Sequence, residues 1–363
     1  MNGWLLLLIV GLVLWGYYHW FFNVAKPLLQ MFLQKEKERE TFPDVTVLVC
    51  AKNEAENLSE LLRKLLNQSY LNYQVMLVND ASTDNTVDVL KRFEKQYPEK
   101  LKTINLATED KQQSGKKGAL LEAYRKISSN WVLQTDADCR PKSKHWVSRM
   151  VFKGLDEQAD IVLGVSLYEE SGTWWHKWVR SESILIALQY LGMAGAGKAF
   201  MAVGRNLLLH KNIYKQVSFP DDLLSGDDDL LMQAWGDKAK VAIAYGRQSQ
   251  TETKQPTGLS TYWHMKKRHL ATANHYRSNH QLALILWPLS LNLTWLGILV
   301  IPGEARYFFC ILMLLRILLL KKISNVIYSN TNAAILLIVE TFIVWQNTLL
   351  YFTQLMSPVK KWK

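Results

Sequence analysis

The stretch Val45–Asn57 reads VTVLVCAKNEAEN and decides the fold class. Its first six residues form a β-branched, apolar run, which is typical of a strand buried on both faces of a sheet. The residues that follow place an apolar face on one side of a helix, formed by Leu58, Leu61, Leu62, Leu65 and Leu66. Asn53 and Glu56 predict a capping box at the start of that helix.

The same alternation of strand and helix continues along the chain. We expect further strands at 74–78, 102–107 and 131–135, and helices at 87–96 and 116–127. Thr83 or Asp84 is placed to cap the helix at 87–96. Alternating strands and helices predict an α/β fold with a mostly parallel sheet.

The N-terminus is apolar over the length of a membrane helix. Trp4–Phe22 contains His19 as its only ionisable residue apart from tyrosines. A cleaved signal peptide would need a basic start and a small-residue cleavage site, and neither is present, so we expect an uncleaved anchor. Basic residues follow this segment and none precedes it, which places the N-terminus outside and the next domain in the cytoplasm.

The C-terminal part is apolar again. Residues 281–303 predict a second span, and 307–320, which contains Arg316, predicts a span or an interfacial helix. Residues 333–352 include Glu340, which we expect to face other helices. Two C-terminal spans would leave the basic tail inside, as the positive-inside rule favours, and three would place it outside, so the number stays open.

These segments predict an integral membrane protein of a bacterial-type inner membrane with a cytoplasmic α/β domain. Its expected parts are an anchor at 1–25, the α/β domain at 42–258, a basic interfacial segment at 259–280 and a membrane region at 281–355.

Charge and cysteine content limit the partners. The net charge of +11 indicates an anionic partner, such as nucleic acid, lipid headgroups or a nucleotide-sugar pyrophosphate. Much of the excess positive charge lies beside the apolar segments, where anionic lipid explains it, so we expect no nucleic acid. The three cysteines are far apart, which argues against a disulfide framework or a zinc site.

Polar residues follow three of the predicted strands, at Asn53–Glu54, Asn79–Asp80 and Asp136–Asp138. Ligands bind at the carboxyl ends of strands in such sheets. Asp136 and Asp138 offer hard oxygen ligands for Mg²⁺ or Mn²⁺, although an Asp pair is also common in plain turns. Lys116 opens a helix where phosphates could bind, or is simply exposed.

A further acidic cluster occurs in SGDDDLL at Ser225–Leu231. Three adjacent acids repel one another, so a pocket that holds them needs a cation, a metal or a raised pKa. A solvated helix start rich in aspartate is the alternative.

The order and spacing of these motifs, over roughly Pro43–Tyr276, resemble the family 2 glycosyltransferases with the GT-A fold. The flanking spans resemble the membrane-bound branch, which includes ceramide glucosyltransferase and the hyaluronan and chitin synthases. The resemblance implies that Lys116 lies near the nucleotide and that Asp138 binds the metal, with Asp136 beside it. It also implies a uridine site that is lined by Ala51, Asn53, Glu54 and Asp80.

The same resemblance assigns the chemistry. Asp228 matches the general base, with Asp227 as the second candidate, and Arg268 matches the arginine of the Q-x-x-R-W motif. Met265 and His269 replace the glutamine and the tryptophan of that motif. In processive synthases the tryptophan helps to hold the growing chain, so its absence, with few C-terminal spans, favours transfer of a single sugar.

The implied function is inverting, metal-dependent transfer of a sugar from a nucleotide-sugar, with UDP favoured, to a membrane lipid or lipid-linked glycan. The alternatives are a processive polysaccharide synthase, a nucleotidyltransferase and a non-enzymatic membrane scaffold. The stretch at 50–57 lacks the glycines of a nucleotidyltransferase phosphate loop. A tryptophan-rich apolar stripe at 174–191 predicts a core helix or an interfacial helix, and 263–280 predicts a basic membrane-proximal helix.

Overall fold

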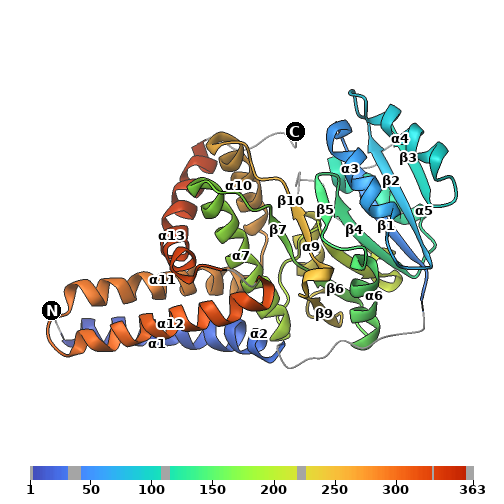
Figure 1. The fold of residues 1–363 in the computed structure, drawn as a ribbon. Helices are drawn as coiled ribbons and strands as arrows, with labels where there is room; N and C mark the ends of the chain where they lie inside the picture. The colour runs from blue at the N-terminus through green and yellow to red at the C-terminus, as the bar shows by residue number, and fades with distance from the viewer. Residues whose placement is uncertain (1–2, 32–41, 108–114, 219–225, 329–330, 357–363) are drawn as a thin grey trace. The chain divides into compact units, whose positions relative to one another are not determined.

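The computed structural model describes residues 3–31, 42–107, 115–218, 226–328 and 331–356. Contacts between residues divide the chain into two compact units, each discontinuous in sequence. The sheet unit comprises Lys35–Glu169 and Met201–Thr257, and the helix unit comprises Met1–Gln34, Glu170–Phe200 and Gly258–Val359. Figure 1 labels the elements of both.

The sheet unit is built on a seven-stranded sheet in the order β3-β2-β1-β4-β8-β6-β9. Its strands are β1 Val45–Ala51, β2 Tyr73–Asp80, β3 Leu101–Leu106, β4 Trp131–Asp136, β6 Ile161–Gly164, β8 Leu207–His210 and β9 Val241–Ala244. The pairs β3/β2, β2/β1, β1/β4 and β6/β9 are parallel, whereas β8 is antiparallel to both of its neighbours. A small second sheet joins β5 Cys139–Pro141, β10 Thr251–Thr253 and β7 Ser166–Tyr168. The mostly parallel α/β sheet is confirmed.

The helices of the sheet unit follow the strands. They are α3 Ala55–Leu66, α4 Thr86–Gln96, α5 Gly115–Lys126, α6 Trp146–Asp156, α8 Lys211–Tyr214 and α9 Asp227–Trp235, with a 3₁₀ turn at Arg247–Ser249. The expected leucine face of α3 is buried in a core that the strands β1, β2 and β4 share with α3 and α6. The strands and helices predicted between 45 and 135 are confirmed, with ends that differ by about two residues at most.

The predicted capping box of α3 is wrong. The helix begins at Ala55 with Glu54 at the N-cap position, and Asn53 has a left-handed φ of 55°. The side chain of Asn53 instead accepts a hydrogen bond from the N–H of Thr83, 2.8 Å away in the turn after β2. Asp84 lies one residue before the N-cap of α4, and its carboxylate accepts the N–H of Thr86, so it serves the start of that helix.

The helix unit contains the apolar ends of the chain. Its elements are α1 Gly3–Trp20, a π-helical segment η1 Phe21–Ala25, α2 Lys26–Met31, α7 Trp174–Gly195, α10 Leu259–Ala273, α11 Ser278–Val300, α12 Ala305–Ile327 and α13 Ala333–Met356. In the described residues, three helical segments are long and apolar enough to cross a membrane: Leu6–Met31, Ser278–Val300 and Ala333–Gln354. The helix at 305–327 is longer than the predicted 307–320 segment.

The stripe at 174–191 forms the buried core of the helix unit over most of its length. From Val179 to Ala194 most side chains of α7 are buried, and the helix packs against η1, α2 and α13. At Gly192 a Cβ would lie 2.6 Å from the Cα of Val24, so only glycine allows this approach of the two backbones. Trp174, at the exposed start of α7, is 59% exposed. The core-helix alternative therefore holds for the body of this helix.

Candidate active site

The carboxyl ends of β1, β2 and β4 meet at one edge of the sheet. Because these strands are parallel, Ala51 is paired with Asn79 and Cys50 with Asp136. The polar residues that follow the strands are thereby brought to the same edge, as predicted. Ala51 and Asp80 are buried there, whereas Asn53 is exposed and Glu54 is half-buried.

Hydrogen bonds join the turn after β1 to the turn after β2. The N–H of Asn53 donates to the Ser82 hydroxyl at 2.9 Å, and the N–H of Glu54 donates to the Thr86 hydroxyl at 3.0 Å. Asn53 and Ala81 both have left-handed backbones, with φ of 55° and 50°. Such conformations are costly in residues other than glycine and persist where the surroundings fix them, often at binding sites.

A lysine and three carboxylates form the centre of the site. The Nζ of Lys116, at the start of α5, lies 2.7 Å from the Asp136 carboxylate and 3.5 Å from that of Asp227. The backbone N–H of Gly204 donates to the Asp228 carboxylate at 2.6 Å. A side chain at Gly204 would crowd this arrangement, because its Cβ would lie 3.2 Å from the Lys116 Nζ.

The charges of this cluster shift its pKa values in opposite directions. Burial of the Lys116 ammonium lowers its pKa, but the carboxylates of Asp136, Asp227 and Asp228 outweigh burial and raise it well above its ordinary value. Burial, followed by the charge of Asp227, raises the pKa of Asp228 to about 6, against the opposing effects of Lys116 and the Gly204 N–H. Lys116 is therefore a fixed cation, whereas Asp228 can exchange a proton near neutral pH.

The second aspartate of the D-A-D motif lies in a group that could hold a metal. Ligand atoms of Asp136, Asp138 and Cys139 lie within 4.8 Å of one another. Burial and the Asp136 charge raise the pKa of Asp138, although nearby Arg205 opposes this, and a divalent cation would relieve the repulsion. Burial raises the pKa of the Cys139 thiol well above its ordinary value, so it stays neutral and is a poor ligand for a hard cation. The two carboxylates fit Mg²⁺ or Mn²⁺.

The described structure brings Lys116, Asp136, Asp227 and Asp228 into one cluster with Asp138 beside it. Arg268 lies on α10 in the helix unit, and its role stays a prediction, as do the base and metal roles. Sequence reasoning missed Gly204, whose contribution is a backbone N–H, and Arg205, a single basic residue without a motif.

Comparisons with known proteins match the part of the chain that carries Lys116, Asp136 and Asp138 to a family, whereas Asp227 and Asp228 lie beyond the matched residues. The family model described as glycosyl transferase family 2 matches residues 46–218. A poly-β-1,6-N-acetyl-D-glucosamine synthase from Staphylococcus epidermidis is 28% identical over 123 residues, which cover 34% of this chain and 28% of the synthase. The glycosyltransferase AglE from Haloferax volcanii is 26% identical over 193 residues, which cover 52% of this chain and 60% of AglE.

A third relative is named as the synthase of a glycolipid. A β-monoglucosyldiacylglycerol synthase from Trichormus variabilis is 34% identical over 112 residues, which cover 30% of this chain and 23% of the synthase. The chain thus spans less than two thirds of the length of each of these relatives.

Among solved structures, the mannosyltransferase PcManGT from Pyrobaculum calidifontis, in complex with GDP-Man and Mn²⁺, is similar with a TM-score of 0.55. The identity is 18%, and the match covers 93% of this chain and 96% of that chain, so the two share a fold. Residues 46–218 therefore form a domain of glycosyl transferase family 2, and the chain has the GT-A fold.

Proposed function

We propose that this protein transfers a single sugar from a nucleotide-sugar, with a UDP-sugar as the first candidate, to a membrane lipid or lipid-linked glycan. The observation that carries this proposal is the Lys116–Asp136–Asp227–Asp228 cluster at the carboxyl edge of a family 2 sheet. A membrane scaffold would have no need to bury a lysine among acids at this position.

Donor binding is assigned to the turns after β1 and β2 together with Lys116. The hydrogen bonds between these turns fix Asn53 and Glu54 beside the buried ends of the strands, where a nucleoside would lie. Lys116 stays protonated at every physiological pH, which suits a group that faces a diphosphate.

Asp228 is assigned the role of general base. Its pKa of about 6 keeps the carboxylate ionised at neutral pH and still basic enough to take a proton. The Gly204 N–H holds one oxygen of the carboxylate in place. The acceptor hydroxyl oxygen attacks the anomeric carbon, the bond to the nucleoside diphosphate breaks, and Asp228 receives the hydroxyl proton. This displacement inverts the anomeric centre.

Asp138 and Asp136 would hold a divalent cation that neutralises the departing diphosphate. Lys116 contacts Asp136 and adds a permanent positive charge at the same place. These two sources of positive charge support a diphosphate leaving group over a neutral one.

A lipid or lipid-linked acceptor is supported by the membrane-length helices and by two of the relatives, which are named as a polysaccharide synthase and a glycolipid synthase. A processive polysaccharide synthase is the second candidate, because of that first relative. Met265 and His269 in the motif around Arg268 favour a single transfer. The positive-inside rule supports a cytoplasmic sheet unit in a bacterial-type membrane.

The experiment that tests this proposal is donor hydrolysis by the full-length protein in detergent. UDP- and GDP-sugars are screened with Mn²⁺, Mg²⁺ or a chelator, with and without membrane lipids. We expect one donor to release its diphosphate in a metal-dependent way and Asp138→Ala to lose this release. No binding or turnover of any donor, even with lipids present, would favour the scaffold alternative.

The base role is tested separately with Asp228→Asn. Sugar transfer should be lost while donor binding is retained, because the amide keeps the shape of the carboxylate but takes no proton. Asp88→Asn, on the exposed face of α4, is the matched control and should transfer normally. Normal turnover in Asp228→Asn would remove Asp228 from the base role.

A further inference from the structure

The last helix of the chain carries an exposed apolar stripe along its whole length. The side chains that form it are Ile338, Phe342, Trp345, Leu349, Phe352 and Met356, which are 42–86% exposed. They alternate in steps of four and three residues, so they lie on one face of α13. We call these six residues the α13 stripe.

Polar contacts outside the stripe hold α13 against its neighbours. Glu340 forms a buried ion pair with Arg316 of α12, and the Gln346 side chain donates to Glu182 of α7 at 2.9 Å. Thr353 accepts a hydrogen bond from Trp263 of α10 at 3.3 Å. These contacts set the rotation of α13 about its axis. The stripe stays largely exposed, and two of its members also meet neighbouring helices: Trp345 donates to Asn292 of α11 at 3.1 Å, and the Phe342 ring lies 6.3 Å from that of Trp178 of α7.

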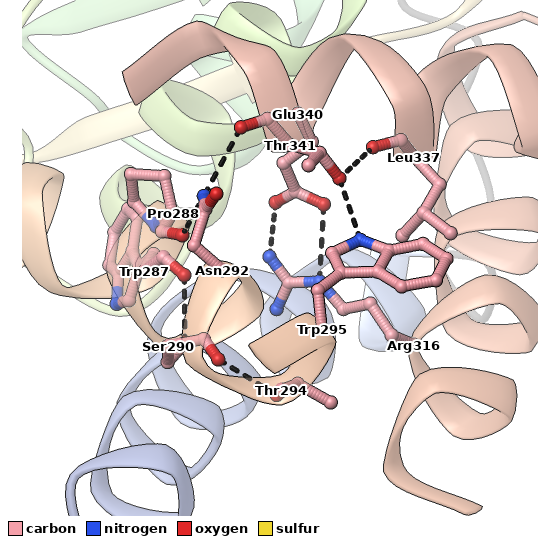
Figure 2. A network of polar contacts seen from close by, with 10 residues as sticks. All are labelled: Trp287, Pro288, Ser290, Asn292, Thr294, Trp295, Arg316, Leu337, Glu340 and Thr341. Atoms are coloured by element: carbon pink, nitrogen blue, oxygen red, sulfur yellow. Dashed lines mark hydrogen bonds and ion pairs between the residues drawn. The ribbon is translucent and has the colours of Figure 1, made fainter. Parts of the chain in front are cut away.

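The contact between Glu340 and Arg316 is part of the buried network that Figure 2 shows. Asn292 and Trp295 of α11 both donate to Thr341, at 3.1 Å to its carbonyl and 3.0 Å to its hydroxyl. The Arg316 guanidinium also lies over the Trp20 ring of α1, 3.4 Å from its centre. A cation placed on an aromatic face and paired with a carboxylate is largely compensated for its burial.

This compensation allows α12 to cross a membrane. The helix is 23 residues long, about 34 Å, which is enough to span the hydrocarbon layer. It packs against α11, and its outer face is apolar at Ile311, Leu314, Leu315 and Leu318. Arg316, the charge in the middle of the helix, is fully buried within the protein.

The helix α13 has a different direction. In Figure 1 the helices α1, α11 and α12 lie side by side, whereas α13 runs across α11 and α12. The polar contacts agree, because Glu340 and Thr341 in its first half meet α12 and α11, whereas Gln346 and Thr353 meet α7 and α10. A helix that crosses a bundle of spans does not share their direction through the bilayer.

We propose that α1, α11 and α12 cross the membrane and that α13 lies in the plane of the bilayer, with the α13 stripe inserted among the lipids of the leaflet at the Lys321–Lys322 end of α12. By composition alone, α13 would be assigned as a span and α12 would not, since α13 is the more apolar of the two. The inference does not depend on the donor, the acceptor or sugar transfer.

The distribution of basic residues supports this arrangement. Lys321 and Lys322 lie at the end of α12 that contacts α2, and Lys26 begins α2. Basic residues gather at one face of a membrane, where anionic headgroups attract them. The positive-inside rule favours this same side for the lysines at the end of the sequence, and an in-plane α13 agrees with that preference.

Topology is tested first, in membrane vesicles that contain the full chain. An impermeant maleimide is applied from either side to Glu304→Cys, Asn330→Cys and Lys363→Cys, with the unsubstituted chain as the blank. Lys64→Cys, on the exposed face of α3, marks the side of the sheet unit. We expect Asn330→Cys and Lys363→Cys to react from the same side as Lys64→Cys, and Glu304→Cys from the other.

The alternatives give different patterns. If α13 spans as a fourth crossing, Lys363→Cys reacts from the side opposite to Lys64→Cys. If α12 does not cross and α13 does, Asn330→Cys changes side instead. Either pattern would overturn the proposal, whether or not the protein turns over a nucleotide-sugar.

The depth of the stripe is measured with nitroxide labels at Ile338, Trp345 and Phe352, by collision with oxygen and with a water-soluble relaxant. A helix in the plane predicts the same depth at all three positions. A spanning helix predicts depths that change along about 21 Å of axis. Labels at Ile311 and Leu318 on α12 are the internal control and should differ in depth. Low oxygen collision at all three α13 positions would show that a second protein copy covers the stripe, which would also refute lipid contact.

Discussion

The pKa of Asp228 gives a pH profile that can be calculated from the structure. With a pKa of about 6, roughly a tenth of these carboxyls are ionised at pH 5 and roughly nine tenths at pH 7. Because a general base acts in its ionised form, kcat/KM should fall about tenfold between pH 7 and pH 5. The assay is initial-rate transfer from the identified donor in a series of buffers at constant ionic strength.

Two variants should move this acid limb in opposite directions. Asp227→Asn removes a negative charge that raises the pKa of Asp228, so the limb should move to lower pH. Lys116→Met removes a positive charge that lowers this pKa, so the limb should move to higher pH, and donor binding should weaken as well. Asp228→Asn should lower the rate about 10²–10⁴-fold at every pH.

A kcat/KM that is flat from pH 5 to pH 8, or two variants that shift the limb in the same direction, would show that Asp228 does not titrate as this cluster implies.

The raised pKa of Asp228 also has a consequence for stability, of known sign. Folding raises the pKa of Asp228 from 3.8 to about 6. This group therefore stabilises the folded state fully below pH 3.8, and the stabilisation is lost as the pH rises through 6.

Three further predictions concern the backbone and the membrane helices. Asn53→Ala should raise the KM for the donor more than it lowers kcat, because the turn loses its bond to Thr83 and keeps a left-handed backbone; a larger effect on kcat would contradict this. Glu340→Gln should destabilise the detergent-purified protein by about 3–5 kcal/mol, because the Arg316 charge stays buried, and Arg316→Met with Glu340→Leu should lower Tm less than Glu340→Gln alone. Gly192→Ala should cost about 1–3 kcal/mol in thermal unfolding, and Gly172→Ala, with nothing within 4 Å of its Cβ, should cost little; equal effects would show that contact with Val24 is not the cause.

Much of the sheet unit follows from local patterns. The apolar run at 45–50 and the leucine spacing after it predict β1 and α3, because a buried strand and an amphipathic helix each have their own period. Parallel strands then place Asp80 and Asp136 at one edge without any further information.

The centre of the site could not be located in this way. Lys116 meets Asp227 across more than a hundred residues of sequence, and only the folded sheet brings the two together. The Gly204 N–H that holds Asp228 is a backbone donor, which every residue except proline carries, so it has no signature in the sequence. The capping box predicted at Asn53 failed because its side chain bonds to Thr83, which is distant in the sequence, and not to the start of its own helix.

Membrane segments show the limits of composition. The apolar stripe at 174–191 is compatible with a core helix or an interfacial helix, and only its contacts with η1 and α13 decide between them. The segment at 307–320 looked short because Arg306 and Lys321 flank it. Arg316 inside it left open whether it spans, because its partner, Glu340, lies on another helix.

The discontinuous units have a consequence for the order in which the protein is made. The ribosome produces α7 before β8, β6 is already complete by then, and the sheet stays open until β8 can pair between β4 and β6. The main partner of α7 among the late elements, α13, is synthesised roughly 140 residues later. The apolar side of α7 must therefore remain in contact with lipid or a chaperone until translation ends. A soluble fragment cut at residues 42 and 258 would carry this uncovered helix, whereas a fragment that joins Glu169 directly to Met201 through a short linker would not.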